Sequence, residues 1–133
     1  MSWLLDTHVW VWSQVEPGKA GPRTTAILSD PLAVLHVATV STLEVARLAR
    51  EGRLHFRVPV ENWVDGSVDL LSAVSLELTH GIAAEACQLP EPFHRDPADP
   101  ILVATARRRN LRLITADQRI LDYPHVETLD ANL

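Results

Sequence analysis

The sequence predicts an α/β protein whose central sheet is built from parallel β-α units and covered by helices on both faces. Short strand-like runs alternate along the chain with segments that have a helical spacing of apolar residues. The strand-like runs are continuously apolar, as expected for strands buried on both faces. With 133 residues, 47% of them apolar, the chain is predicted to form one domain over residues 1–133.

The first half of the chain gives two predicted strands and three predicted helices. The strands are residues 2–5 and 35–39, and the helical segments are residues 7–13, which could instead form a turn, 24–29 and 41–51. Pro31 ends the second of these helices, because proline cannot continue a helix. Ser41 with Glu44 three residues later has the spacing of a capping box, and Gly52 is a typical stop.

The second half of the chain continues the same alternation. Strands are expected at residues 73–76, 112–115 and 126–129, and helices at residues 60–70, 79–89, 101–109 and 117–121. Trp63 is predicted to anchor the first of these helices in the core, and Thr79 to cap the second. Every predicted strand is thus followed by or preceded by a helix, as parallel β-α units require.

The charge and cysteine content restrict the class of protein. A formal net charge of −5 argues against a protein that coats nucleic acid, but not against a nuclease whose metal ion meets the phosphates. The basic group of Arg107–Arg109 with Arg112 is either a nucleic-acid patch or a helix end favoured by the dipole. Cys87 is the single cysteine, so no intrachain disulfide can form, which fits a cytoplasmic protein. We expect neither a signal peptide nor a membrane span.

Four acidic residues stand at the edges of predicted buried elements, where an ionised carboxylate is costly unless it is paired or binds a metal. Asp6 ends the first strand, and Asp117 follows the strand at 112–115. Glu44 lies within an apolar helical stretch, and Asp99 precedes another. Because parallel sheets bind ligands outside the carboxyl ends of their strands, we expect the four carboxylates to meet at one edge.

Clustered carboxylates suit a hard divalent cation such as Mg²⁺ or Mn²⁺, whose charge offsets their mutual repulsion. Neither cysteine nor histidine accompanies them in a zinc-binding pattern. The matching reaction is hydrolysis of a phosphodiester by a metal-activated water. The sequence shows no Ser-His-Asp or Cys-His arrangement that would supply a side-chain nucleophile.

Each acid also has a purely structural explanation: Asp6 and Asp117 could cap the helices that follow them, and Glu44 could complete a capping box with Ser41. Asp96, with proline next to it, has the pattern of such a cap, and Asp99 could cap a helix that starts at Pro100. The hydroxyls of Thr7, Ser41 and Thr115 could orient a carboxylate or a water, or bond only the backbone. His8 is expected in the core or on the surface, and His94-Arg95 could meet a phosphate.

Six short segments, taken in this order and spacing, are more specific than any one acid. They are LLDTHV (4–9), VSTLEVA (40–46), GRL (52–54), HRDPAD (94–99), ILVATA (101–106) and LITAD (113–117). Together they resemble the VapC toxin family of PIN-domain proteins, and the resemblance spans nearly the whole chain. Pro100 is a departure, because a basic residue often follows the third acid in that family.

The resemblance implies a three-layer α/β/α sandwich with a central, mostly parallel sheet. It implies a Mg²⁺- or Mn²⁺-dependent ribonuclease that acts as the toxin of a type II toxin–antitoxin pair, with RNA as substrate. It further implies a homodimer, and a small antitoxin that threads a segment, often with an arginine, into the acidic pocket. The family's four acidic positions match Asp6, Glu44, Asp99 and Asp117, while Asp96 and Thr115 match supporting positions.

Two other functions compete with this hypothesis. A catalytically weak PIN-like module would bind RNA or a basic peptide in the acidic groove without turnover. A phosphotransfer domain would use Asp6 as nucleophile, but phosphatases of the haloacid dehalogenase type need a second aspartate where this chain has His8.

Overall fold

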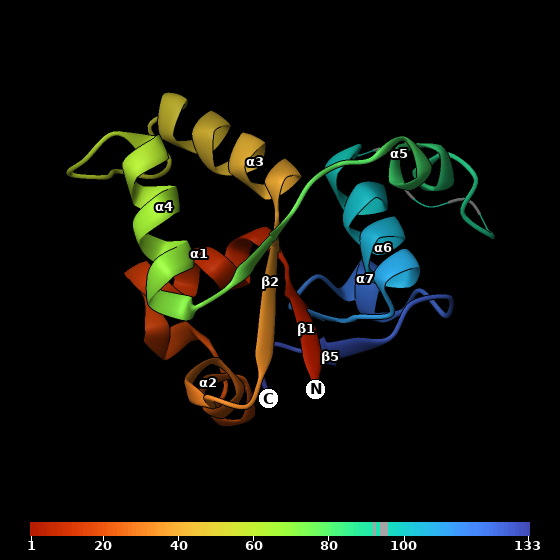
Figure 1. Ribbon diagram of the computed structural model, residues 1–133, viewed down its shortest axis with the longest axis horizontal. Coiled ribbons are helices and arrows are strands. Elements are labelled where there is room, and N and C mark those ends of the chain that lie inside the picture. Colours follow the sequence, from red (N-terminus) through yellow and green to blue (C-terminus); the bar gives the residue numbers. More distant parts are fainter. Residues whose placement is uncertain (92, 94–95) are drawn as a thin grey trace.

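The computed structural model describes residues 1–91, 93 and 96–133 and shows a five-stranded sheet between two layers of helices (Figure 1). The strand order is β3-β2-β1-β4-β5, and all four neighbouring pairs are parallel. The strands are β1 (Ser2–Leu5), β2 (Val34–Ala38), β3 (Val74–Leu76), β4 (Arg112–Thr115) and β5 (Thr128–Asp130). The predicted α/β class and the parallel sheet are therefore confirmed.

The helices follow the predicted alternation with small shifts at their ends. They are α1 (Thr7–Val15), the 3₁₀ turn η1 (Pro17–Lys19), α2 (Pro22–Ser29), α3 (Thr39–Arg50), α4 (Val60–Leu71), α5 (His80–Ala86), α6 (Ala98–Arg109) and α7 (Gln118–Leu121). None of the helices in the described part of the chain is long and apolar enough to cross a membrane.

Alternate residues of the central strand supply two separate cores. Trp3 and Leu5 face α1, α2, α3 and α4, whereas Leu4 faces α5, α6 and α7 on the other side of the sheet (Figure 1). This follows from the two-residue period of a strand, and it explains why β1 is apolar throughout. Trp10 of α1 is fully buried and donates from its indole nitrogen to Ser67 Oγ of α4 at 3.0 Å. A buried aromatic of this kind stabilises a fold by about 3–5 kcal/mol relative to alanine.

Two helix starts differ from the prediction, and both differences concern site residues. Helix α3 begins at Thr39, and its N-cap, Ala38, has no side-chain cap bond, so Ser41 is not an N-cap. Helix α6 begins at Ala98, so Asp99 lies in its first turn and does not cap a helix that starts at Pro100. In both cases the hydroxyl or carboxylate that seemed available for capping is directed to a neighbouring element instead.

Candidate active site

Asp6 is held rigidly where the central strand β1 meets helix α1. One carboxylate oxygen accepts from the Thr7 amide at 2.7 Å, so the predicted cap bond is present. The other oxygen accepts from the hydroxyl of Thr115 at 2.7 Å. Since Leu5 pairs with Ile114 across the sheet, Thr115 is the residue of β4 beside Asp6. With only 3% of Asp6 exposed, these bonds fix the direction of its carboxylate.

Glu44 belongs to α3, yet its carboxylate is fixed from α1. Thr7 Oγ1 lies 2.5 Å from Oε1 of Glu44 and 2.9 Å from Ser41 Oγ. One hydroxyl carries one proton and a carboxylate only accepts, so Thr7 donates its hydrogen bond to Glu44 and can accept one from the hydroxyl of Ser41. The capping box predicted for Ser41 and Glu44 is therefore wrong, because both side chains reach across to Thr7. Thr7 links the first two acids of the site.

Asp117 follows β4 and caps the short helix α7. Its amide donates to Thr115 Oγ1 at 3.0 Å, and its Oδ1 accepts from the amide of Arg119 at 2.9 Å. Thr115 therefore connects Asp117 to Asp6 through a single hydroxyl. The predicted supporting role of Thr115 has a physical basis. Its fully buried hydroxyl orients the carboxylate of Asp6 and holds the backbone at Asp117.

Asp99 enters the same region from the first turn of α6 and is 7% exposed. Proline is tolerated at Pro100 because the first turn of a helix has amides without intrahelical partners. Pro100 thus leaves Asp99 buried at the site. Asp96 accepts from the Ala98 amide at 3.1 Å, but the N-cap of α6 is Pro97, so the prediction that Asp96 is the N-cap and proline the first helical residue is wrong by one position. His94 and Arg95 lie outside the described residues.

One cavity of about 410 Å³ brings all of these acids together. Its walls include Asp6, Glu44, Asp96, Asp99 and Asp117. Thr7, His8 and Arg119 also line it, whereas Ser41 and Thr115 are fully buried behind the wall. The predicted meeting of four carboxylates at the carboxyl ends of the strands is seen in the structure.

Burial and mutual repulsion raise the pKa values of two of these carboxylates. Burial, and then the charges of Asp6, Asp96, Asp117 and Glu44, raise the pKa of Asp99 to about 7. Burial also raises the pKa of Glu44, and the hydrogen bond from Thr7 opposes that shift. A divalent cation bound among these acids would offset the repulsion between their charges.

The oxygen donors fit Mg²⁺ or Mn²⁺ in kind, but they are not arranged as a finished cage. Among the residues that the structure describes, no three Asp, Glu, His or Cys side chains form a group that could hold a metal ion. Asp117 is instead engaged by the guanidinium of Arg119, whose Nη2 lies 3.1 Å from Oδ2 of Asp117. Binding of a cation at Asp117 would require this ion pair to separate.

Sequence reasoning missed the position of His8. Its Nε2 accepts from the amide of Ala116 at 2.9 Å, so that nitrogen carries no proton and the neutral ring has its proton on Nδ1. Nδ1 lies 3.6 Å from Oδ2 of Asp6. The ring also packs against Trp12. His8 therefore ties the β4–α7 loop to α1 and lies beside Asp6, and only the pairing of β1 with β4 could have revealed this.

The family is decided by comparison over almost the whole chain. The model of the PIN domain matches residues 3–126. The chain belongs to the PIN-domain family. This PIN domain is 35% identical over 124 residues to ribonuclease VapC22 of Mycobacterium tuberculosis, with 92% of each chain covered. The resemblance to the VapC family that the six segments predicted is thereby confirmed.

Solved structures show the same fold for this PIN domain. VapBC2 from Rickettsia felis, bound to a DNA fragment from its promoter, gives a TM-score of 0.68 at 11% identity, covering 97% of this chain and 98% of that one. FitAcB from Neisseria gonorrhoeae gives a TM-score of 0.62 at 21% identity and covers 98% of both chains. The predicted three-layer architecture is confirmed by these likenesses.

Proposed function

We propose that this PIN domain is a metal-dependent endoribonuclease and the toxin of a type II toxin–antitoxin pair. The observation that carries the proposal is the gathering of Asp6, Glu44, Asp99 and Asp117 in one cavity of a chain that is 35% identical to a ribonuclease. A binding module without turnover would have less use for carboxylates whose burial, and then their mutual repulsion, raise the pKa of Asp99 to about 7.

In this proposal Asp6, Asp99 and Asp117 hold Mg²⁺ or Mn²⁺, and Glu44 is a further ligand or orients the attacking water. A divalent cation bound here would activate that water and stabilise charge on the phosphate. Thr7 holds one oxygen of Glu44, while the other has no hydrogen-bond partner among the described residues. The raised pKa of Glu44 suits it to accept a proton from water.

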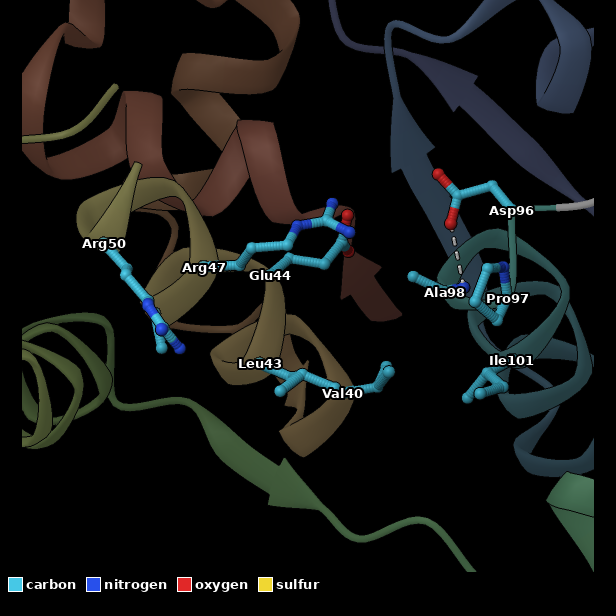
Figure 2. Close-up of a pocket in the computed structure, with 10 residues that line it drawn as sticks. Val40, Leu43, Glu44, Arg47, Arg50, Asp96, Pro97, Ala98 and Ile101 are labelled. Carbon is cyan, nitrogen blue, oxygen red and sulfur yellow. Dashed lines mark hydrogen bonds between the residues drawn. The ribbon is translucent and has the colours of Figure 1, made fainter. Parts of the chain in front are cut away.

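A second cavity of about 460 Å³ continues from the carboxylates and gives RNA a path past them. Figure 2 shows Glu44 and Asp96 on opposite sides of it, with Arg47 and Arg50 on the wall formed by α3. Val40, Leu43 and Ile101 make much of the remaining lining apolar. Arginines beside an apolar surface suit a single strand, whose phosphates pair with cations and whose bases pack on the wall.

Replacing Arg47 and Arg50 by glutamine should raise the KM for RNA and leave kcat nearly unchanged, because these arginines would bind phosphates beside the reacting one. We expect KM to rise about tenfold for the double variant and the dependence of affinity on salt to become shallower by about one to two phosphate contacts. Steady-state cleavage of a defined RNA at several salt concentrations measures both. An unchanged salt dependence would remove this cavity from the RNA path.

The similar solved structures suggest which partner this chain binds. Neighbouring structures include VapBC and FitAB complexes, so we propose a small cognate antitoxin for this chain. An arginine from such an antitoxin would compete with the cation for the same carboxylates. A homodimer and a cytoplasmic location are part of the proposal, and a short reading frame upstream of this one would identify the antitoxin.

Cleavage of a total RNA pool by purified, antitoxin-free protein tests the function. The reactions contain Mn²⁺, Mg²⁺ or a chelator, and circular dichroism confirms that the protein is folded. Discrete products that need the metal are expected. If folded protein binds RNA from several pools but gives no metal-dependent products, the binding module is supported instead.

Thr115→Val should reduce cleavage about 10- to 100-fold, which is typical for loss of a residue that orients a metal ligand. Valine has the shape of threonine but cannot donate to Asp6 or accept from the Asp117 amide. Thr115→Ser keeps the hydroxyl and serves as the matched control. Initial rates at saturating Mn²⁺ decide the matter, and equal losses in both variants would show that packing, not the hydroxyl, matters at this position.

A further inference from the structure

The guanidinium of Arg119 lies at one side of the cavity and forms hydrogen bonds with the carboxylate of Asp117. Nε lies 3.3 Å from Oδ1 and Nη2 lies 3.1 Å from Oδ2, so both oxygens of Asp117 face the same cation. Nη2 is also 3.8 Å from Oδ2 of Asp99. Arg119 therefore bridges two of the acids assigned to the metal.

This pairing is incompatible with full coordination of a cation. An oxygen that accepts from a guanidinium has fewer lone pairs for a metal, and the two positive charges would repel each other at such short range. In this structure the carboxylate of Asp117 is turned to Arg119.

We propose that Arg119 is a positioning residue that exchanges with the divalent cation at Asp117. Before the cation binds, Arg119 neutralises Asp117 and Asp99. When the cation binds, the guanidinium moves to the mouth of the cavity and contacts a phosphate of the RNA. The inference rests on the proposed function and adds a residue to it.

The position of Arg119 suits both states. Its side chain is 62% exposed, compared with 22% for Asp117, so it can turn outward while the acid stays in place. Its backbone amide donates separately to Asp117 Oδ1 at 2.9 Å, a bond in which the guanidinium takes no part. A planar guanidinium binds carboxylate and phosphate alike through two parallel hydrogen bonds, which a lysine cannot reproduce.

Arg53 offers a matched control because it lines the same cavity. Its Nη1 lies 3.8 Å from Oε1 of Glu51, and among the described residues no hydrogen bond or ion pair joins Arg53 to any of the site acids. Arg53→Gln therefore removes the same charge from the same cavity without freeing a metal ligand. Arg119→Lys keeps the charge but loses the paired hydrogen bonds.

Calorimetric titration of metal-free protein with Mn²⁺ tests the exchange directly. Arg119→Gln is expected to bind Mn²⁺ about five- to tenfold more tightly than the wild type, and Arg53→Gln less than about twofold more tightly. Arg119→Lys should lie between these two variants. With Mn²⁺ saturating, Arg119→Gln should raise the KM for RNA about tenfold, as expected for a lost charged hydrogen bond.

Equal Mn²⁺ affinity in the Arg119→Gln and Arg53→Gln variants would overturn the exchange, and so would a weaker affinity in Arg119→Gln. In both cases a wild type that binds Mn²⁺ and cleaves RNA would leave the proposed function standing. A folded wild type that neither binds Mn²⁺ nor cleaves RNA would instead contradict the proposed function, and this inference with it.

Discussion

Asp6→Asn is expected to lower RNA cleavage by on the order of 10³-fold or more, as for other residues that hold a reacting centre. The amide has the shape of the carboxylate but lacks the charge that holds a divalent cation. The side-chain oxygen of asparagine can still accept from the backbone amide of Thr7, so the start of α1 is retained. Asp117→Asn should have a comparable effect. Initial rates with saturating Mn²⁺, together with the circular dichroism of each variant, measure the loss.

Asp69→Asn on the exposed surface of α4 is the matched control and should cleave like the wild type. Removing one charge from the crowded acidic cavity relieves repulsion, so metal-free Asp6→Asn should be no less stable than the wild type. A folded Asp6→Asn protein with full activity would refute the assignment of Asp6. Loss of activity through unfolding would show as a lowered midpoint of urea denaturation.

Mn²⁺ affinity should fall about tenfold for each pH unit below 7, because Asp99 must lose its proton before it can bind a metal. The pKa of Asp99 is raised to about 7, mainly by burial and then by the neighbouring carboxylates. Glu44, whose pKa is also raised, adds to the slope in the same direction. Calorimetric titration at pH 5.5, 6.5 and 8 measures the effect, and Asp99→Asn should show a shallower slope. Equal affinity at pH 5.5 and pH 8 would contradict it.

The same pKa shift links the stability of the metal-free protein to pH. The folded state holds its Asp99 proton up to about pH 7, whereas an unfolded aspartate loses it near pH 3.9. The folded state thus binds more protons between these values, and the free energy of unfolding falls as pH rises through that window. The loss amounts to a few kcal/mol at most. Urea denaturation in chelator at pH 5 and pH 8 checks the sign, and a smaller change in Asp99→Asn supports the assignment.

The fold could be predicted from the sequence because local pattern and global architecture agree. Trp3-Leu4-Leu5 is apolar at every position, which indicates a strand buried on both faces, and the structure places it at the centre of the sheet. The meeting of Asp6 and Asp117 followed from the same reasoning, since both come after strands whose carboxyl ends share one edge. The four acids were therefore accessible to prediction before any contact was known.

Side-chain partners across the sheet could not be predicted in this way. Ser41 and Glu44 have the spacing of a capping box, but both side chains form hydrogen bonds with the hydroxyl of Thr7, more than thirty residues away. His8 bonds Ala116 only because β1 pairs with β4 in the register Leu5 to Ile114. Arg119 follows Asp117 by two residues, and its bridge to Asp99 depends on where α6 begins. Register and helix ends, which local patterns fix poorly, decide these contacts.

Anomalous diffraction from crystals soaked in Mn²⁺ would show whether the carboxylates at the ends of β1 and β4 hold one or two divalent cations. We expect a peak within about 2.0–2.3 Å of oxygens from Asp6, Asp99 and Asp117, with Arg119 turned from Asp117. The peak should vanish in crystals of Asp6→Asn grown in the same way. A well-ordered cavity without a peak at saturating Mn²⁺, in protein that still cleaves RNA, would show that these carboxylates do not hold a catalytic metal.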